Sequence, residues 1–125
     1  MILLIDNYDS FVFNVEQYVK ELTKEEVRCV RNDKITLEEI KKLNPSKIIL
    51  SPGPKHPKDS GVCLEILQAN LGVPVLGICL GHQAIGLSFG AKIKRLDDPL
   101  HGKTSFIDVK NKESLFAGLP ERFEV

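Results

Sequence analysis

The chain has 125 residues, of which 42% are hydrophobic, and this is enough to bury one core and predicts a single domain. The 17 Lys and Arg residues balance the 17 Asp and Glu residues, which argues against binding to nucleic acid or to a membrane surface. Three cysteines without C-x-x-C spacing argue against a disulfide framework and a zinc site. No signal peptide or membrane-spanning run is recognised, so a reducing cytoplasm fits best.

Short apolar runs alternate with amphipathic stretches along most of the chain. Strands are predicted at residues 1–5, 27–30, 48–50, 74–77, 91–96 and 106–109. The strand at 91–96 carries several basic side chains and is expected at an outer position. Strands that alternate with helices predict an α/β fold with three layers, in which a doubly wound, mostly parallel sheet binds ligands beyond the carboxyl ends of its strands.

The helices are predicted from their caps and apolar stripes. The first follows a turn at residues 7–9, with Asp9 or Ser10 as cap, and its stripe consists of Phe11, Val15, Tyr18, Val19 and Leu22. Phe13 lies off this stripe, where a partner contact and a satellite core position are both open. Later helices are expected after a capping box at residues 36–39, after Ser60, and from Gly81 onward, with a helical turn at 114–120.

Cys79 lies where the fourth apolar run meets the next predicted helix, on the tight turn between them. Gly77 and Gly81 stand two positions on either side, which is the G-x-nucleophile-x-G spacing of a sharp strand-to-helix elbow. A helix that begins after Cys79 directs free N–H groups at the sulfur, which favours the thiolate. A cysteine in an apolar run is more often an inert core residue, as is expected of Cys29 and Cys63. Two polar residues, His82 and Gln83, follow Cys79 and favour a nucleophile there.

A second polar loop follows the third predicted strand and is therefore expected at the same sheet edge as Cys79. Its sequence is Ser51-Pro52-Gly53-Pro54. Two prolines around a glycine make a stiff bend whose N–H and C=O directions are preset, as an oxyanion hole requires. An ordinary turn is the alternative interpretation of this bend.

Residues 77–83, Gly-Ile-Cys-Leu-Gly-His-Gln, resemble the nucleophile motif of class I glutamine amidotransferases. Residues 5–11 and 100–105 are similar to segments of the glutaminase subunits, component II, of anthranilate synthase and aminodeoxychorismate (para-aminobenzoate) synthase. The resemblance implies that Cys79 attacks the side-chain amide of glutamine, forms a thioester and releases ammonia to a chorismate-using partner subunit, component I. It implies neither a metal ion nor an organic cofactor for this chain, and it leaves the choice between the two synthases open.

The resemblance also implies roles for residues of both loops. The backbone of Gly53, Pro54 and Lys55 would contact glutamine, and the side chain of Gln83 would hold it. The Gly53 and Leu80 N–H groups would pair around the carbonyl oxygen. Lys55 stands where a second glycine is usual, which argues against a contact that needs a positive φ at that position.

A cysteine nucleophile needs a base within hydrogen-bond reach, and the family takes its base from a His-Pro-Glu motif that these 125 residues lack. Residues 1–125 are therefore interpreted as a single glutamine amidotransferase domain truncated at its carboxyl end, with little or no activity alone. An inactive docking subunit is the alternative. A phosphoacceptor receiver fits less well because the third strand ends in Ser51, and flavin binding fits less well because Asp9 places a carboxylate in the first turn.

Overall fold

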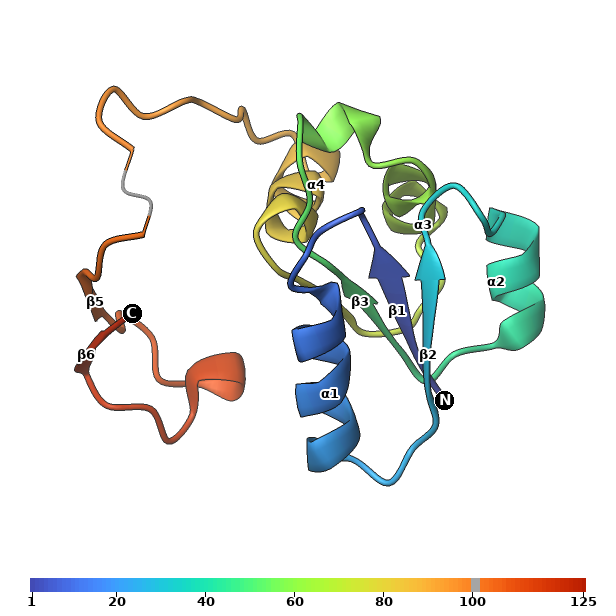
Figure 1. Ribbon diagram of the computed structural model, residues 1–125, viewed down its shortest axis with the longest axis horizontal. Coiled ribbons are helices and arrows are strands. Elements are labelled where there is room, and N and C mark those ends of the chain that lie inside the picture. The colour runs from blue at the N-terminus through green and yellow to red at the C-terminus, as the bar shows by residue number, and fades with distance from the viewer. Residues whose placement is uncertain (100–101) are drawn as a thin grey trace. The chain divides into compact units, whose positions relative to one another are not determined.

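The computed structural model describes residues 1–99 and 102–125, which form two compact units, Met1–Ile93 and Lys94–Val125. The first unit contains a parallel sheet of four strands in the order β2-β1-β3-β4. The strands β1, β2 and β3 of this sheet are labelled in Figure 1. The strands are β1 (Ile2–Asp6), β2 (Val27–Arg31), β3 (Lys47–Leu50) and β4 (Val75–Gly77). The predicted α/β fold with a mostly parallel sheet is confirmed, whereas the single domain over residues 1–125 stays a prediction.

Helices join successive strands and place the carboxyl ends of all four strands at one edge of the sheet (Figure 1). They are α1 (Val12–Leu22), α2 (Leu37–Leu43), α3 (Val62–Ala69) and α4 (Leu80–Ser88), with a short 3-10 turn η1 (Pro57–Asp59) before α3. None of the helices in the described part of the chain combines the length and the apolar character needed to cross a membrane.

The sheet has a core on each face because alternate side chains of β1 point to opposite sides. The core beneath α2 and α3 contains Leu3, Ile5, Ile40, Ile48, Leu50, Val62, Cys63 and Ile66. The core beneath α1 contains Ile2, Leu4, Val12 and Ile49. These two cores give the three layers that the alternating pattern predicted.

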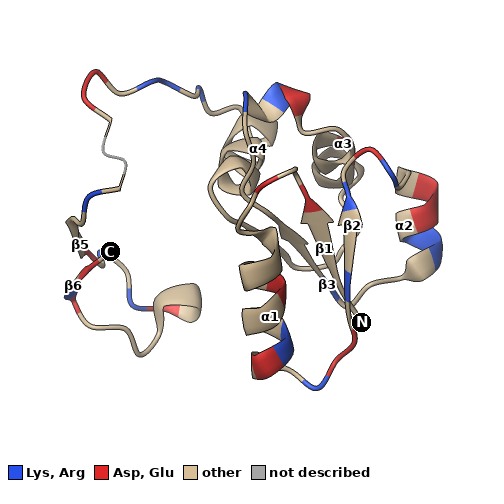
Figure 2. Cartoon of the chain, viewed as in Figure 1, with Lys and Arg blue, Asp and Glu red and all other residues tan. Residues whose placement is uncertain are grey.

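The start of α2 is capped as the sequence predicted. The Thr36 hydroxyl accepts from the Glu39 N–H at 3.3 Å, and the Glu39 carboxylate accepts from the Thr36 N–H at 2.8 Å. The latter bond lowers the pKa of Glu39. Acidic residues lie in the first turn of α2 and basic residues in its last turn (Figure 2), the arrangement that complements the helix dipole.

The predicted stripe of α1 was partly wrong. Val12 is buried and Val15 and Val19 pack against the core, whereas Phe11, Tyr18 and Leu22 are 63%, 64% and 87% exposed. The two stripes share positions 15 and 19 and lie side by side on the helix, so the apolar periodicity could not choose between them. Phe13, left open by the sequence, is exposed.

Two further predictions were wrong in detail. The cap residue of α3 is Gly61 at φ 56°, and the helix ends at Asn70 in the left-handed conformation, before Gly72. Ser60 instead donates its hydroxyl to the Pro57 carbonyl at 2.6 Å. Residues 91–96 form no strand, because a strand needs a neighbouring strand and none pairs with this segment among the described residues.

The second unit contains β5 (Phe106–Asp108), which pairs antiparallel with β6 (Arg122–Glu124), and a 3-10 turn η2 (Ser114–Phe116). The predicted strand and helical turn of this region are therefore present in shorter form. Residues 100 and 101 of the predicted motif at 100–105 lie outside the described residues.

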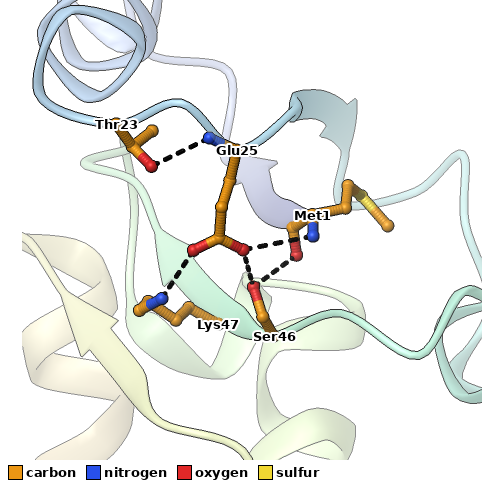
Figure 3. A network of polar contacts seen from close by, with 5 residues as sticks. All are labelled: Met1, Thr23, Glu25, Ser46 and Lys47. Carbon is orange, nitrogen blue, oxygen red and sulfur yellow. Dashed lines mark hydrogen bonds and ion pairs between the residues drawn. The ribbon is translucent and has the colours of Figure 1, made fainter.

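A polar cluster joins segments at the amino ends of the strands (Figure 3). The Glu25 carboxylate accepts from Lys47 Nζ at 2.7 Å, from the Met1 ammonium at 3.2 Å and from the Ser46 hydroxyl. These bonds, the one from Lys47 most of all, lower the pKa of Glu25 to about 2. The cluster lies at the sheet edge opposite to the one that carries the polar loops.

Candidate active site

Cys79 occupies the turn between β4 and α4, as the sequence predicted. It is the cap residue of α4, and it is exposed. Its backbone has φ 51° and ψ −106°, a conformation that residues with a Cβ atom rarely adopt and that costs about 1–3 kcal/mol. A strained strand-to-helix turn of this kind holds the nucleophile of many hydrolases clear of the sheet.

The two glycines around Cys79 are required by backbone packing. A Cβ atom on Gly77 would lie 2.6 Å from the backbone oxygen of Gly81 and from the backbone nitrogen of His82. A Cβ atom on Gly81 would lie 2.6 Å from the Cβ atom of Leu50. The end of β4, the start of α4 and the end of β3 therefore meet at distances that only glycine permits.

The Ser51–Pro54 loop lies against this elbow. A Cβ atom on Gly53 would lie 2.7 Å from a side-chain carbon of Leu80, the first residue of α4, and 2.6 Å from the Asn7 Cβ atom. Among residues 1–99 and 102–125, neither the Gly53 N–H nor the Leu80 N–H meets a hydrogen-bond acceptor. Two backbone N–H groups without an acceptor in the described ranges thus lie on adjacent segments, one directly after Cys79 and one on the loop that contacts Leu80.

A buried polar network supports the loop from below. Asn7 donates its side-chain amide to the Ser51 carbonyl at 2.9 Å, and its N–H donates to the Ser51 hydroxyl at 2.9 Å. The side-chain oxygen of Asn7 accepts from Asn32 at 2.9 Å and from the Cys63 thiol at 3.3 Å. Sequence reasoning missed this network because its members are 25 to 56 positions apart. The available signal was that polar residues directly follow the first three strands of the chain.

A pocket of about 280 Å³ opens beside the loop. Its lining includes Asn7, Tyr8, Asn32, Asp33, Pro54, Lys55, Asp59 and Leu80. Lys55 has φ 68°, so the backbone takes a positive φ here although the side chain is not glycine. The lysine therefore does not prevent a positive φ at this position, whereas a backbone contact of Lys55 with glutamine stays a prediction. On the pocket wall the Tyr8 hydroxyl donates to Asp33 at 2.7 Å, which raises the pKa of Tyr8.

The remaining candidates lie on or near α4. Gln83 is half-buried on the first turn of α4, and its N–H donates to the Cys79 carbonyl at 3.0 Å. His82 is exposed on the same turn. His56 accepts from the Lys58 N–H at 3.2 Å and so caps η1. Within the described part of the chain, no histidine forms a hydrogen bond with Cys79.

The other two cysteines differ from Cys79 in their surroundings. Cys63 is fully buried in the core beneath α3, and burial raises the pKa of its thiol to about 11. Cys29 is half-buried against the other core, and burial, with a smaller effect from Glu16, raises its pKa to about 11. In the described ranges no three His, Cys, Asp or Glu residues are grouped so that they could hold a metal ion.

The fold and the site define an α/β protein with an exposed cysteine on a strained strand-to-helix turn, close to a loop whose Gly53 N–H has no acceptor among the described residues. The sequence matches the family described as Glutamine amidotransferase class-I over residues 3–125. The chain belongs to this family.

Relatives in this family are named as component 2 of anthranilate synthase, of aminodeoxychorismate synthase, or of both. The chain is 50% identical to an anthranilate synthase component 2 of Pyropia yezoensis over 98% of its own length and 65% of the relative's. It is 49% identical to the aminodeoxychorismate synthase component 2 of Escherichia coli, over 95% and 63% of the two lengths. It is 47% identical to the aminodeoxychorismate/anthranilate synthase component 2 of Bacillus subtilis, over 95% and 61%. The chain thus spans less than two thirds of the length of these relatives.

Proposed function

We propose that this chain carries the nucleophile and the oxyanion donors of a glutaminase, which supplies ammonia to a chorismate-using synthase subunit. The observation that carries the proposal is the exposed, strained Cys79 near the N–H groups of Gly53 and Leu80, neither of which meets an acceptor among residues 1–99 and 102–125. Anthranilate synthase is the first candidate for the assembly, and aminodeoxychorismate synthase is the alternative. The identities to the relatives of each name differ too little to separate the two.

In the proposed reaction, the Cys79 sulfur attacks the side-chain carbonyl carbon of glutamine. The carbonyl oxygen gains a negative charge, which the Gly53 and Leu80 N–H groups stabilise by hydrogen bonds. The carbon–nitrogen bond then breaks, ammonia leaves with a proton from a general acid, and a thioester remains. Water cleaves the thioester to glutamate and restores the thiol.

Local electrostatics support this reaction. The first N–H groups of α4 lack partners within the helix, and the helix dipole adds positive potential at this end, which suits a negative charge that develops on a bound carbonyl oxygen. Gln83, Pro54 and Lys55 lie on elements that border the same edge, and we assign the side chain of Gln83 and the backbone of Pro54 and Lys55 to binding of glutamine. A reducing compartment such as the cytoplasm suits a free nucleophilic thiol.

The proton transfers need a base, which the family resemblance assigns to a His-Pro-Glu motif. Because the 125 residues do not contain this motif, we expect slow turnover of glutamine by this chain alone. The first half-reaction is testable without that base if the leaving group needs no proton. The γ-(4-nitrophenyl) ester of glutamate meets this condition, because 4-nitrophenolate leaves as a stable anion.

The experiment mixes the chain with this ester and records the release of 4-nitrophenolate. We expect a burst of about one equivalent per chain as the thioester forms. Glutamine should slow the burst by competition, and Cys79→Ala should abolish it while Cys63→Ala keeps it. A chain without a burst, or a burst that survives Cys79→Ala, would contradict the proposal and leave the docking subunit as the better interpretation.

The assembly is tested separately by adding a chorismate-using synthase subunit of each type. We expect this chain to bind to one of them, and a full-length relative serves as the positive control for glutamine-dependent amination of chorismate. Binding to neither subunit would contradict the proposed partner without affecting the assignment of Cys79.

A further inference from the structure

We propose that Ser51 is a positioning residue, whose hydroxyl holds the Pro52 carbonyl and thereby fixes the direction of the Gly53 N–H. The inference rests on the proposed function, since it assigns to the Gly53 N–H the stabilisation of the oxyanion. It extends that function to a residue that touches neither the substrate nor Cys79.

The two hydrogen bonds of the Ser51 hydroxyl have a fixed direction. Ser51 is fully buried, and its oxygen lies 2.9 Å from the Asn7 nitrogen and 2.6 Å from the Pro52 oxygen. The Asn7 N–H can only donate, and the Pro52 carbonyl can only accept. The single hydroxyl proton of Ser51 therefore points at the Pro52 oxygen. The hydroxyl thus links the Asn7 N–H, from which it accepts, to the Pro52 carbonyl, to which it donates.

The Pro52 carbonyl and the Gly53 N–H belong to the same peptide group. This group is planar, and no cis peptide bond occurs among the described residues, so the C=O and N–H bonds point in opposite directions. Holding the oxygen toward the buried Ser51–Asn7 pair turns the N–H away from that pair. The N–H is then available to a ligand, in agreement with its lack of an acceptor in the described part of the chain.

The rest of the network keeps Ser51 itself in place. Asn7 holds the Ser51 carbonyl as well as its hydroxyl, and Asn32 and Cys63 hold the side chain of Asn7. The Gly53 Cα atom is wedged between Asn7 and Leu80, where no Cβ atom would fit. The loop therefore has little freedom to find another orientation, and a donor that is oriented before the reaction is the kind that accelerates it.

Ser51→Ala removes this link between Asn7 and Pro52, and Ser60→Ala serves as the control. Ser60 is also buried, and its hydroxyl also donates to a carbonyl, that of Pro57, at 2.6 Å. Ser51→Ala removes two hydrogen bonds of a buried hydroxyl and Ser60→Ala removes one, so both should lower the melting temperature, Ser51→Ala by more. Only Ser51 lies next to the peptide group that carries the Gly53 N–H.

The first measurement is the residual dipolar coupling of the Gly53 N–H, which reports the direction of this bond. We expect a changed coupling in Ser51→Ala and an unchanged one in Ser60→Ala. The second is the rate of the 4-nitrophenolate burst, which we expect to fall at least about tenfold in Ser51→Ala and to change little in Ser60→Ala. Alkylation of Cys79 by iodoacetamide, which needs no oxyanion, should keep its rate in both variants.

Every outcome of these measurements either supports or contradicts the positioning role of Ser51. An unchanged Gly53 coupling, an unchanged burst rate in Ser51→Ala, or equal losses of rate in the two variants overturns the role of Ser51 while the proposed function stands. A wild-type chain without a burst overturns both. If Ser51→Ala does not fold, Ser51→Cys keeps an atom at the position of the hydroxyl, slightly larger than oxygen, and weakens the donor. Its burst rate should then fall relative to that of Ser60→Cys.

Discussion

A Cβ atom on Gly81 would overlap with the backbone oxygen of Leu50 and would lie 2.6 Å from the Leu50 Cβ atom. The first turn of α4 therefore rests directly on the end of β3. Gly81→Ala must push these two segments apart, and we expect it to lower the free energy of unfolding by about 3 kcal/mol or more. Chemical denaturation measures this loss.

The control for this prediction is Gly86→Ala on the same helix. A Cβ atom on Gly86 would make only an ordinary contact, 3.6 Å from the Ala91 Cβ atom. Because alanine has the higher helix propensity, this variant should gain about 0.5–1 kcal/mol. Similar effects of the two substitutions would refute the close packing of α4 on β3.

The strain at Cys79 predicts an unusual order of stabilities. Glycine adopts φ 51° and ψ −106° with much less strain than alanine, so Cys79→Gly should be more stable than Cys79→Ala by about 1–2 kcal/mol. Cys29 in β2 is the control, since glycine weakens a strand and the order should reverse there. Thermal and chemical denaturation of the four variants measure both differences. The same order at both positions would argue against a strained elbow.

Lys55 has φ 68°, a conformation that costs residues with a Cβ atom about 1–2 kcal/mol. Lys55→Gly should therefore stabilise the chain by about 1 kcal/mol, after the entropy that glycine adds to the unfolded state is subtracted. Lys58 is exposed in η1 without a positive φ, and Lys58→Gly should be neutral or destabilising. The difference in denaturation midpoint between the two variants tests the prediction, and a loss of stability in both would contradict it.

The Glu25 cluster predicts a dependence of stability on pH. Folding lowers the pKa of Glu25 from 4.5 to about 2, so the folded state favours the ionised carboxylate. Its contribution to stability is fully present above about pH 4.5, declines as the pH falls, and is lost below about pH 2. The difference in unfolding free energy between wild type and Glu25→Gln should shrink as the pH falls from about 4.5 to about 2.

Glu26→Gln is the control for this titration, because Glu26 forms no ion pair among the described residues. Its difference from wild type should stay small between pH 2 and pH 6. A Glu25→Gln difference that is constant with pH would show that the carboxylate is not held by Lys47 and Ser46.

The three cysteines should react with iodoacetamide in a defined order. Cys79 is exposed, whereas burial raises the pKa of both Cys29 and Cys63 to about 11, so these two carry little thiolate at pH 8. Cys29 is half-buried and Cys63 is fully buried, which places Cys63 last. Peptide mapping by mass spectrometry after short exposure gives the order. Equal labelling of the three would remove the distinction on which the assignment of Cys79 depends.

Local patterns in the sequence were sufficient for much of this protein. The capping box of α2 and the turn at Cys79 depend on residues within a few positions of one another, and both were predicted correctly. The alternation of strands and helices predicted the parallel sheet, because parallel strands need a crossover between them. The motif around Cys79 was also sufficient to indicate the family.

Tertiary structure decided the features that depend on distant segments. The burial of Val12 in place of Phe11 follows from how α1 meets the sheet, and the missing strand at residues 91–96 follows from the lack of a neighbour to pair with. The positive φ of Lys55 follows from the bend around it, against the preference of the residue. The contact of Gly53 with Leu80, and the network that joins Ser51 to Asn7, Asn32 and Cys63, require the ends of three strands and the starts of two helices to converge. Convergence of this kind comes from packing of the whole sheet, and no short stretch of sequence encodes it.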